Sequence, residues 1–223
     1  MTGGTGLPAW IRRSYTAPGL TQIPPGPHLR SVQERFGGTV MLCIDVSGSM
    51  VGAPLAEAVR GAAQFVAEAV AAHYRVGAIL WDDGVAAVAE PTASGLTAHG
   101  VLDAALIRGG TNLLPGLTRC HQVLRGFTGD RVVALFGDGD LGPQRVEVLA
   151  LVAVMKAENI RFVTRGLGSR AAQVFGEISD EDPASSTVAE VGDLADAIAD
   201  MAGALTRNRI AARGHQAGDG DRS

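Results

Sequence analysis

The chain has 223 residues, of which 46% are hydrophobic and 19% charged, so it can bury the core of one domain and is not a wholly disordered protein. Its formal net charge of −4 argues against a broad basic surface for nucleic acid. No apolar run reaches the roughly 20 residues of a membrane-spanning helix, and no secretory signal is visible. The two cysteines fit a reducing compartment, so we expect a cytoplasmic protein without a nucleic-acid or membrane partner.

Both ends of the chain differ in composition from its middle. Residues 1–37 contain five prolines, which disfavour a long helix, together with apolar residues such as Trp10 and Tyr15 that a plain linker lacks. We expect this segment to be either a strap on the domain's own surface or a docking arm for a partner. Residues 208–223 are polar and Gly-rich and are expected to form a flexible tail. One domain is therefore predicted over residues 38–207.

Within that domain, short apolar runs alternate with segments that are apolar on one helical face. The predicted strands are Thr39–Asp45, Arg75–Trp81, Val85–Ala89, Arg131–Phe136 and Ile160–Leu167, and the predicted helices are Pro54–Ala72, Leu113–Arg125, Pro143–Glu158 and Asp193–Leu205. Asp83-Gly84 is a hairpin signal, so the third run is expected to pair antiparallel with the second. The alternation predicts an α/β sandwich around a mostly parallel sheet.

Three loops rich in glycine and in oxygen-bearing side chains occupy particular places in this pattern. Residues 45–50 (DVSGSM) follow the first strand, residues 109–112 (GGTN) precede a helix, and residues 137–140 (GDGD) follow the fourth strand. Each loop alone is what an ordinary turn or helix cap uses. Ligands of open parallel sheets bind beyond the carboxyl ends of the strands, so the three loops are expected to converge at that edge. Their order and placement together make the signal specific.

These loops resemble those of the von Willebrand factor A (VWA) domain. Residues 44–50 are similar to the family's Asp-x-Ser-x-Ser signature, residues 109–112 to its second loop, and residues 136–139 to its third, in which Gly137 replaces the usual threonine. The resemblance covers residues 38–207. It implies a Rossmann-like three-layer α/β sandwich with a central, mostly parallel six-stranded sheet, one antiparallel edge strand and helices on both faces.

The resemblance also implies a metal-ion-dependent adhesion site. Its ligands would be Asp45, Ser47, Ser49, Thr111 and Asp138. These hard oxygen donors suit Mg²⁺, with Mn²⁺ and Ca²⁺ as less suitable alternatives, whereas the lack of nitrogen and sulfur donors argues against zinc. Two carboxylates balance the charge of a divalent cation and leave a demand for one more anionic oxygen, which a Glu or Asp of a partner can supply.

We therefore expect a non-enzymatic, metal-dependent protein-interaction module. Intracellular bacterial members of the family work beside AAA+ ATPases or in other multi-protein systems, and the resemblance implies such a setting. Two alternatives stay open: a structural scaffold with an unused metal site, and a Mg²⁺-dependent phosphoryl-transfer enzyme. Against the enzyme, Ser47 stands where a haloacid-dehalogenase-type phosphatase has a second carboxylate, and the chain's one lysine, Lys156, lies in a predicted helix.

Several other reactive side chains have simpler interpretations. Asp140 is interpreted as a solvated cap before the helix that begins at Pro143, and Asp82 and Asp83 as hairpin residues. Cys43 lies within the first strand and Cys120 on the apolar face of a helix, so both are expected to be core residues rather than reactive thiols.

Overall fold

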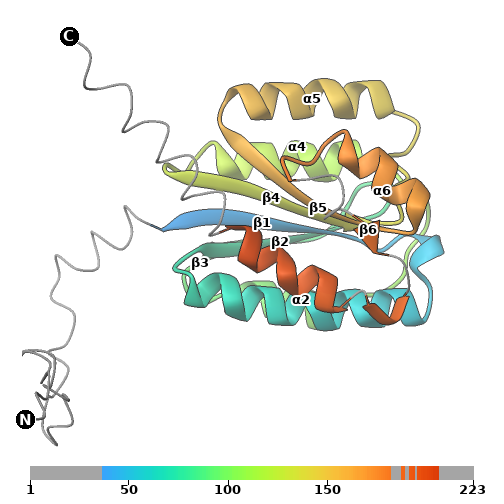
Figure 1. Ribbon diagram of the computed structural model, residues 1–223, viewed down its shortest axis with the longest axis horizontal. Coiled ribbons are helices and arrows are strands. Elements are labelled where there is room, and N and C mark those ends of the chain that lie inside the picture. Colours follow the sequence, from blue (N-terminus) through green and yellow to red (C-terminus); the bar gives the residue numbers. More distant parts are fainter. Residues whose placement is uncertain (1–36, 182–186, 189–190, 194, 206–223) are drawn as a thin grey trace, which may run out of the picture.

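A mixed sheet of six strands separates two layers of helices (Figure 1). The computed structural model describes residues 37–181, 187–188, 191–193 and 195–205. The strand order is β3-β2-β1-β4-β5-β6, and only β2 and β3 pair antiparallel. The strands are β1 (Gly38–Asp45), β2 (Arg75–Trp81), β3 (Val85–Thr92), β4 (Asp130–Gly137), β5 (Ile160–Leu167) and the two-residue β6 (Thr187–Val188). This architecture confirms the fold class expected from the sequence.

The central position of β1 explains its composition. It pairs with β2 on one side and β4 on the other, and all eight of its residues are buried. A parallel strand covered on both faces is expected to be mainly apolar, as residues 40–44 of β1 are. Its side chains alternate between the faces, so Val40, Leu42 and Ile44 enter one apolar layer while Met41 and Cys43 enter the other.

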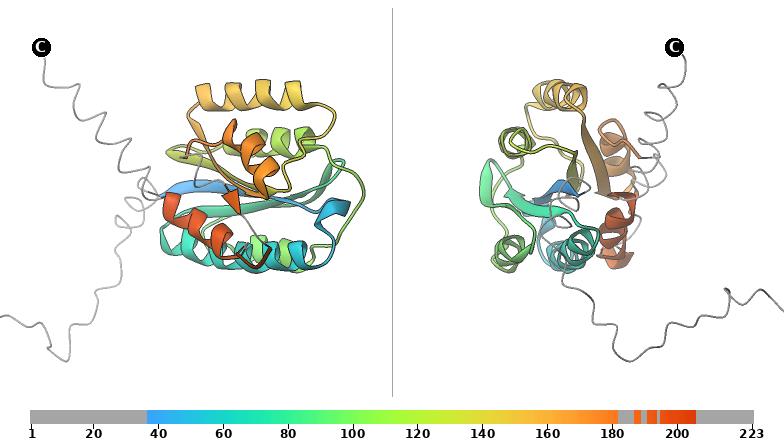
Figure 2. Two further views of the ribbon diagram at one scale, coloured as in Figure 1. Left: turned by 45° about the vertical axis from the view of Figure 1, so that its right-hand side comes forward. Right: turned by 90° about the vertical axis from the view of Figure 1, so that its left-hand side faces the viewer.

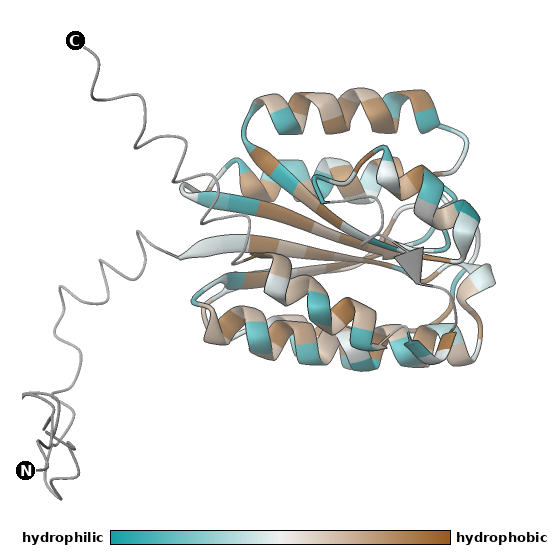
Figure 3. Ribbon diagram, viewed as in Figure 1, coloured by the Kyte–Doolittle hydropathy of each residue, from teal (hydrophilic) through white to brown (hydrophobic). Residues whose placement is uncertain are grey.

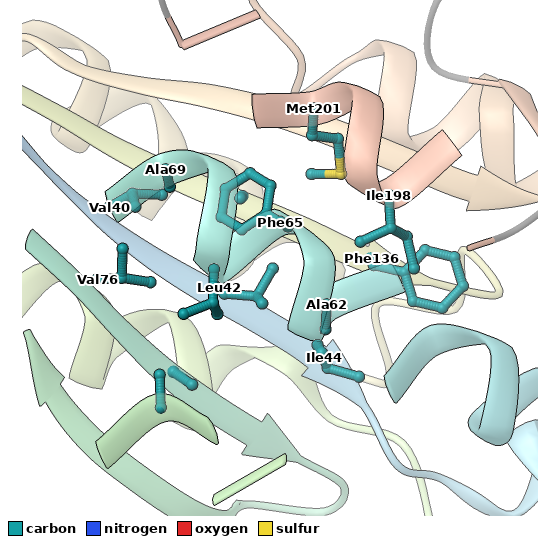
Figure 4. Packing of buried hydrophobic residues seen from close by; sticks show 14 of the residues in the cluster. Val40, Leu42, Ile44, Ala62, Phe65, Ala69, Val76, Phe136, Ile198 and Met201 are labelled. Atoms are coloured by element: carbon teal, nitrogen blue, oxygen red, sulfur yellow. The ribbon is translucent and has the colours of Figure 1, made fainter. Parts of the chain in front are cut away.

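The helices divide between these two layers. The helices are α2 (Ala53–Ala71), α3 (Leu96–Asp103), α4 (Leu113–Leu124), α5 (Arg145–Ala157), α6 (Ser169–Gly176) and a last helix over residues 195–205. The first core layer joins β1 to α2, α3 and the 195–205 helix, and the second joins it to α4, α5 and α6 (Figure 2). Figure 4 shows the first layer, where Phe65 of α2 and Met201 of the last helix lie over the sheet.

Hydropathy follows this layering. Figure 3 shows apolar residues along the middle of the sheet and hydrophilic residues on the outward sides of the helices. On α2, for example, Phe65 is fully buried while Arg60 and Glu68 lie on the solvent side. The one-sided apolar pattern that predicts these helices is thus the pattern by which they cover the sheet.

Several element boundaries differ from the sequence prediction. The edge strand β3 continues past the predicted Ala89 to Thr92, because an edge strand tolerates Pro91. Helix α5 begins at Arg145, so Pro143 lies in the preceding turn and not in the helix. The sequence analysis did not locate α3, α6, β6 or the short 3-10 helices η2 (Gly48–Met50) and η4 (Val191–Asp193). The predicted strap, except Gly37, and the predicted tail lie outside the described residues.

A close approach between α2 and the last helix depends on Gly61. A Cβ atom at residue 61 would lie 2.5 Å from the carbonyl oxygen of Ala195 and 2.7 Å from its Cα. These are backbone atoms, which cannot move aside as the end of a flexible side chain can. By contrast, Gly100 is an exposed residue of α3, and a Cβ there would meet no atom within 4 Å.

We therefore expect opposite effects from the same substitution in two helices. Gly61→Ala should lower the free energy of unfolding by roughly 1–3 kcal/mol, because the helices have to move apart. Gly100→Ala should raise it by about 0.5–1 kcal/mol through helix propensity alone. Urea denaturation of both variants and the wild type measures these differences. A stabilised Gly61→Ala variant would contradict the close packing of the two helices.

Candidate functional site

The first candidate loop begins where β1 ends. The side chain of Asp45 is fully buried, and its Oδ1 accepts a hydrogen bond from the backbone N–H of Ser47 at 2.8 Å. Ser47 is also buried, whereas Ser49 is exposed. The single turn η2 brings the two serine hydroxyls together, with 2.9 Å between their Oγ atoms. The first loop thus places one carboxylate and two hydroxyls at the carboxyl end of the central strand.

The second loop is bound to the first by backbone hydrogen bonds. The N–H of Gly48 donates to the carbonyl oxygen of Gly109 at 3.0 Å, and the N–H of Arg108 donates to that of Val46 at 2.9 Å. Asn112 then begins α4, where its side-chain oxygen accepts from the N–H of Leu114 at 3.2 Å. Thr111 is half-buried just before this cap. The hydrogen bonds between the two loops therefore fix the position of Thr111 relative to the first loop.

Asp83 supports the second loop, a role that the sequence analysis missed. Its Oδ2 accepts a hydrogen bond from the N–H of Gly110 at 3.1 Å. A Cβ at residue 110 would lie 2.1 Å from Oδ1 of the same aspartate, so a larger residue here would displace the Asp83 side chain. The sequence pattern Asp83-Gly84 indicates a hairpin and nothing more. No local signal could connect it to a loop that lies 27 residues further along the chain.

The third loop is built from successive aspartate turns. Oδ1 of Asp138 accepts from the N–H of Asp140 at 3.1 Å, and Oδ1 of Asp140 accepts from the N–H of Gly142 at 2.9 Å. Gly142 lies against the second loop, since a Cβ there would be 2.4 Å from the carbonyl oxygen of Thr111. Asp140 is exposed and closes this turn. It does not cap α5, as the sequence analysis expected, because the N-cap residue is Gln144.

Gly137 places the third loop beside the first. A Cβ at this residue would lie 3.1 Å from both Cβ and Oδ2 of Asp45. A larger residue would therefore press on the buried carboxylate, and glycine leaves the space next to Oδ2 open. Glycine in place of the threonine that is usual in this motif therefore leaves more space around Asp45.

The electrostatics of the site centre on Asp45. Its Oδ2 is buried without a hydrogen-bond partner among the residues that the structure describes. The pKa of Asp45 is raised to about 6, mainly by burial and in smaller part by the negative charge of Asp138, although hydrogen bonds from Ser47 and from the backbone of Asp138 act to lower it. A buried carboxylate with an unpaired oxygen is costly unless a positive charge compensates it. The site therefore favours a cation.

The structure thus brings together most of the predicted site residues. Asp45, Ser47 and Ser49 form one hydrogen-bonded group, Asp138 influences the charge of that group, and Thr111 lies on the loop attached to it. Within the described ranges, no cluster of three or more His, Cys, Asp or Glu residues could hold a metal. Hydroxyl groups would have to complete the ligand set, which fits a hard cation such as Mg²⁺.

Comparison with known proteins supports this fold and motif. Residues 40–140, which include all three loops, match the family model for the von Willebrand factor type A domain. The vWF domain of the type V pili tip protein Mfa5 from Porphyromonas gingivalis superposes with a TM-score of 0.65 at 12% identity, covering 77% of this chain and 95% of that one. No curated protein matches the chain in sequence.

Two further solved structures are similar over part of their length. The pilus adhesin SpaC from Lactobacillus rhamnosus GG has a TM-score of 0.62 at 15% identity, covering 78% of this chain and 30% of that one. A von Willebrand factor type A protein from Catenulispora acidiphila has a TM-score of 0.61 at 15% identity, covering 76% of this chain and 42% of that one. This chain therefore spans less than half of each of these two proteins.

Residues 40–140 of this chain are similar in sequence to a von Willebrand factor type A domain, and the sheet with its helices has the fold of such a domain. Domains of this type commonly act as protein-interaction modules. At 12–15% identity the solved structures show the shared fold, and the family model adds the assignment of the loops' region. None of the helices in the described part of the chain is long and apolar enough to cross a membrane.

The buried charge of Asp45 predicts a pH-dependent stability in EDTA. Its pKa is about 6 in the folded protein against an ordinary 3.8, so the folded state binds more protons between these values, and stability falls as the pH rises through that window. Asp45→Asn keeps the shape and removes the charge. It should raise the free energy of unfolding by roughly 1–3 kcal/mol at pH 8 and leave it unchanged near pH 4.

Urea denaturation of wild type and Asp45→Asn, both in EDTA and at a series of pH values from 4 to 8, tests this prediction. The difference in stability between the two proteins should grow with pH. A constant difference would mean that Asp45 ionises in the folded domain as easily as in the unfolded chain.

Proposed function

We propose that this chain is a protein-interaction module in which a bound divalent cation recruits an acidic side chain of a partner protein. Mg²⁺ is the proposed ion, with Mn²⁺ and Ca²⁺ as alternatives. The residues proposed to hold it are Asp45, Ser47, Ser49, Thr111 and Asp138. The observation that carries the proposal is the buried Oδ2 of Asp45, which has no partner within the described part of the chain and lies beside a second acidic residue and two hydroxyls.

The charge of the ligand set supports an acidic partner. Asp45 and Asp138 together carry two negative charges, which balance a divalent cation, and hydroxyl groups and water are neutral ligands. When bound, the cation would thus accept one further anionic oxygen from outside the domain. The exposure of Ser49 leaves the outer side of the site accessible to such a group. A Glu or Asp side chain of a protein supplies an oxygen of this kind.

The chemistry of the loops favours binding over catalysis. Residues 45–50, 109–112 and 137–142 contain no histidine or lysine that could transfer a proton to or from a substrate. The pilus tip protein and the pilus adhesin that resemble this chain are named for attachment structures. For this chain we propose a non-enzymatic role in a cytoplasmic, bacterial multi-protein system, with an AAA+ ATPase as one candidate partner.

Metal binding can be measured without knowledge of the partner. Millimolar Mg²⁺ should raise the thermal midpoint of the wild type, because a ligand that binds only the folded state stabilises it. Asp45→Asn should abolish this rise, since it removes the charge at the centre of the ligand set. Glu147→Gln removes an exposed carboxylate from the first turn of α5 and should leave the rise intact. Isothermal titration calorimetry gives the affinities, and equal Mg²⁺ binding by all three proteins would refute the site.

Partner capture tests the function itself. Wild type and Asp45→Asn are immobilised and exposed to lysate of the native host, each with Mg²⁺ and with EDTA, and retained proteins are identified by mass spectrometry. We expect one partner to be retained by the wild type with Mg²⁺ and lost in the other three conditions. Equal retention in all four would indicate a scaffold with an unused site. Mg²⁺-dependent hydrolysis of a phosphate ester that Asp45→Asn abolishes would instead indicate an enzyme.

A further inference from the structure

The only two cysteines of the chain meet in its core. The Sγ atoms of Cys43 and Cys120 lie 3.9 Å apart, although 77 residues separate them in the sequence. Cys43 belongs to β1 and Cys120 to α4, and neither side chain is exposed to solvent. The sequence analysis placed each cysteine in the core on its own. Their contact is a product of the tertiary structure.

The surroundings of the two sulfurs hold them against each other. Both belong to the apolar layer between the sheet and α4, in which Met41, Leu117 and Leu124 are also fully buried. A disulfide bond is about 2.05 Å long, so the sulfurs have to approach by roughly 2 Å. This movement requires rotation of both side chains or a shift of α4 toward β1. Because the chain has no third cysteine, no other intramolecular pairing competes.

We propose that Cys43 and Cys120 form an intramolecular disulfide when the chain folds in the presence of a small disulfide oxidant such as oxidised glutathione. The thiolate of one cysteine attacks the oxidant, which forms a mixed disulfide and releases one reduced glutathione. The thiolate of the other cysteine then attacks the protein sulfur of that mixed disulfide and releases the second glutathione. In total, two protein thiols are oxidised, one glutathione disulfide is reduced, and the two protein thiol protons end on the two glutathione thiols.

Burial determines when this exchange can happen. Thiol–disulfide exchange requires access of the oxidant to a sulfur atom, and both sulfurs are closed off in the folded domain. The reduced folded protein should therefore resist oxidation. The bond, once formed and enclosed, should resist reduction for the same reason. The redox state of this pair would thus be set during folding and would record the compartment in which the chain folded.

A covalent link between β1 and α4 would also stabilise the domain. It would close a loop that contains most of the first half of the fold, including α2, β2, β3 and α3. Closing a loop of this size reduces the freedom of the unfolded chain, and the thermal midpoint should rise by on the order of 5–10 °C. This inference does not depend on the proposed metal site.

The test is to refold the full chain under two redox conditions. The protein is unfolded in denaturant with reductant and then refolded either with reductant alone or with a mixture of reduced and oxidised glutathione. Free thiols are counted under denaturing conditions, and non-reduced peptides are analysed by mass spectrometry. We expect two free thiols in the first sample. The second should have none, should contain a Cys43–Cys120 cross-linked peptide in a monomer, and should have the higher thermal midpoint.

Two controls make the result decisive. Already folded, reduced protein kept in the same glutathione mixture should retain both thiols, and rapid oxidation there would overturn the dependence on folding. Cys120→Ser, refolded in the same way, should show no rise in thermal midpoint. Two free thiols, glutathione adducts or disulfide-linked dimers as the main product of oxidative refolding of the wild type would overturn the proposed bond.

Discussion

The buried carboxylate of Asp45 is the constraint on which the rest of the site depends. It lies at the end of the most deeply enclosed strand of the sheet, where one of its oxygens is satisfied by Ser47 and the other is left without a partner among the described residues. Burying such a group costs free energy that the core of the domain has to offset. A positive charge placed next to this carboxylate would offset that cost.

The three loops around this carboxylate hold one another in place through close backbone contacts. Gly48 bonds to Gly109, Gly110 lies against Asp83, and Gly142 lies against Thr111. Glycine is required most clearly at Gly142, which has a positive φ and where a Cβ would meet the backbone of the second loop. The proposed ligands therefore come from three distant parts of the sequence, and contacts between the backbones of the loops hold these parts together. If the proposed metal binds here, such preorganisation would help a site of neutral hydroxyls and two carboxylates to select a small, hard cation.

The two apolar layers on either side of the sheet each contain one close contact between distant parts of the chain. The layer with α2 and the last helix depends on a close approach at Gly61. The layer with α4 contains the cysteine contact, on the same face of β1 that leads to Asp45. Helix α4 begins directly after the second candidate loop and contains Cys120. The position of this helix therefore affects both the candidate site and the thiol pair.

The sequence alone determined the main strands and the longer helices, because these follow from short-range patterns such as the apolar run of β1 and the one-sided pattern of α2. Its resemblance to a known family also proposed five candidate ligands, which stay a prediction. It did not locate the short α6, or the part of β3 beyond Ala89, where pairing and burial override local preference. Only the tertiary structure decided that Asp83 supports Gly110, that one oxygen of Asp45 has no partner among the described residues, and that Cys43 touches Cys120. Each of these facts depends on how the sheet and helices pack, because packing brings atoms from separate chain segments together. No local pattern in the sequence encodes the distances between such atoms.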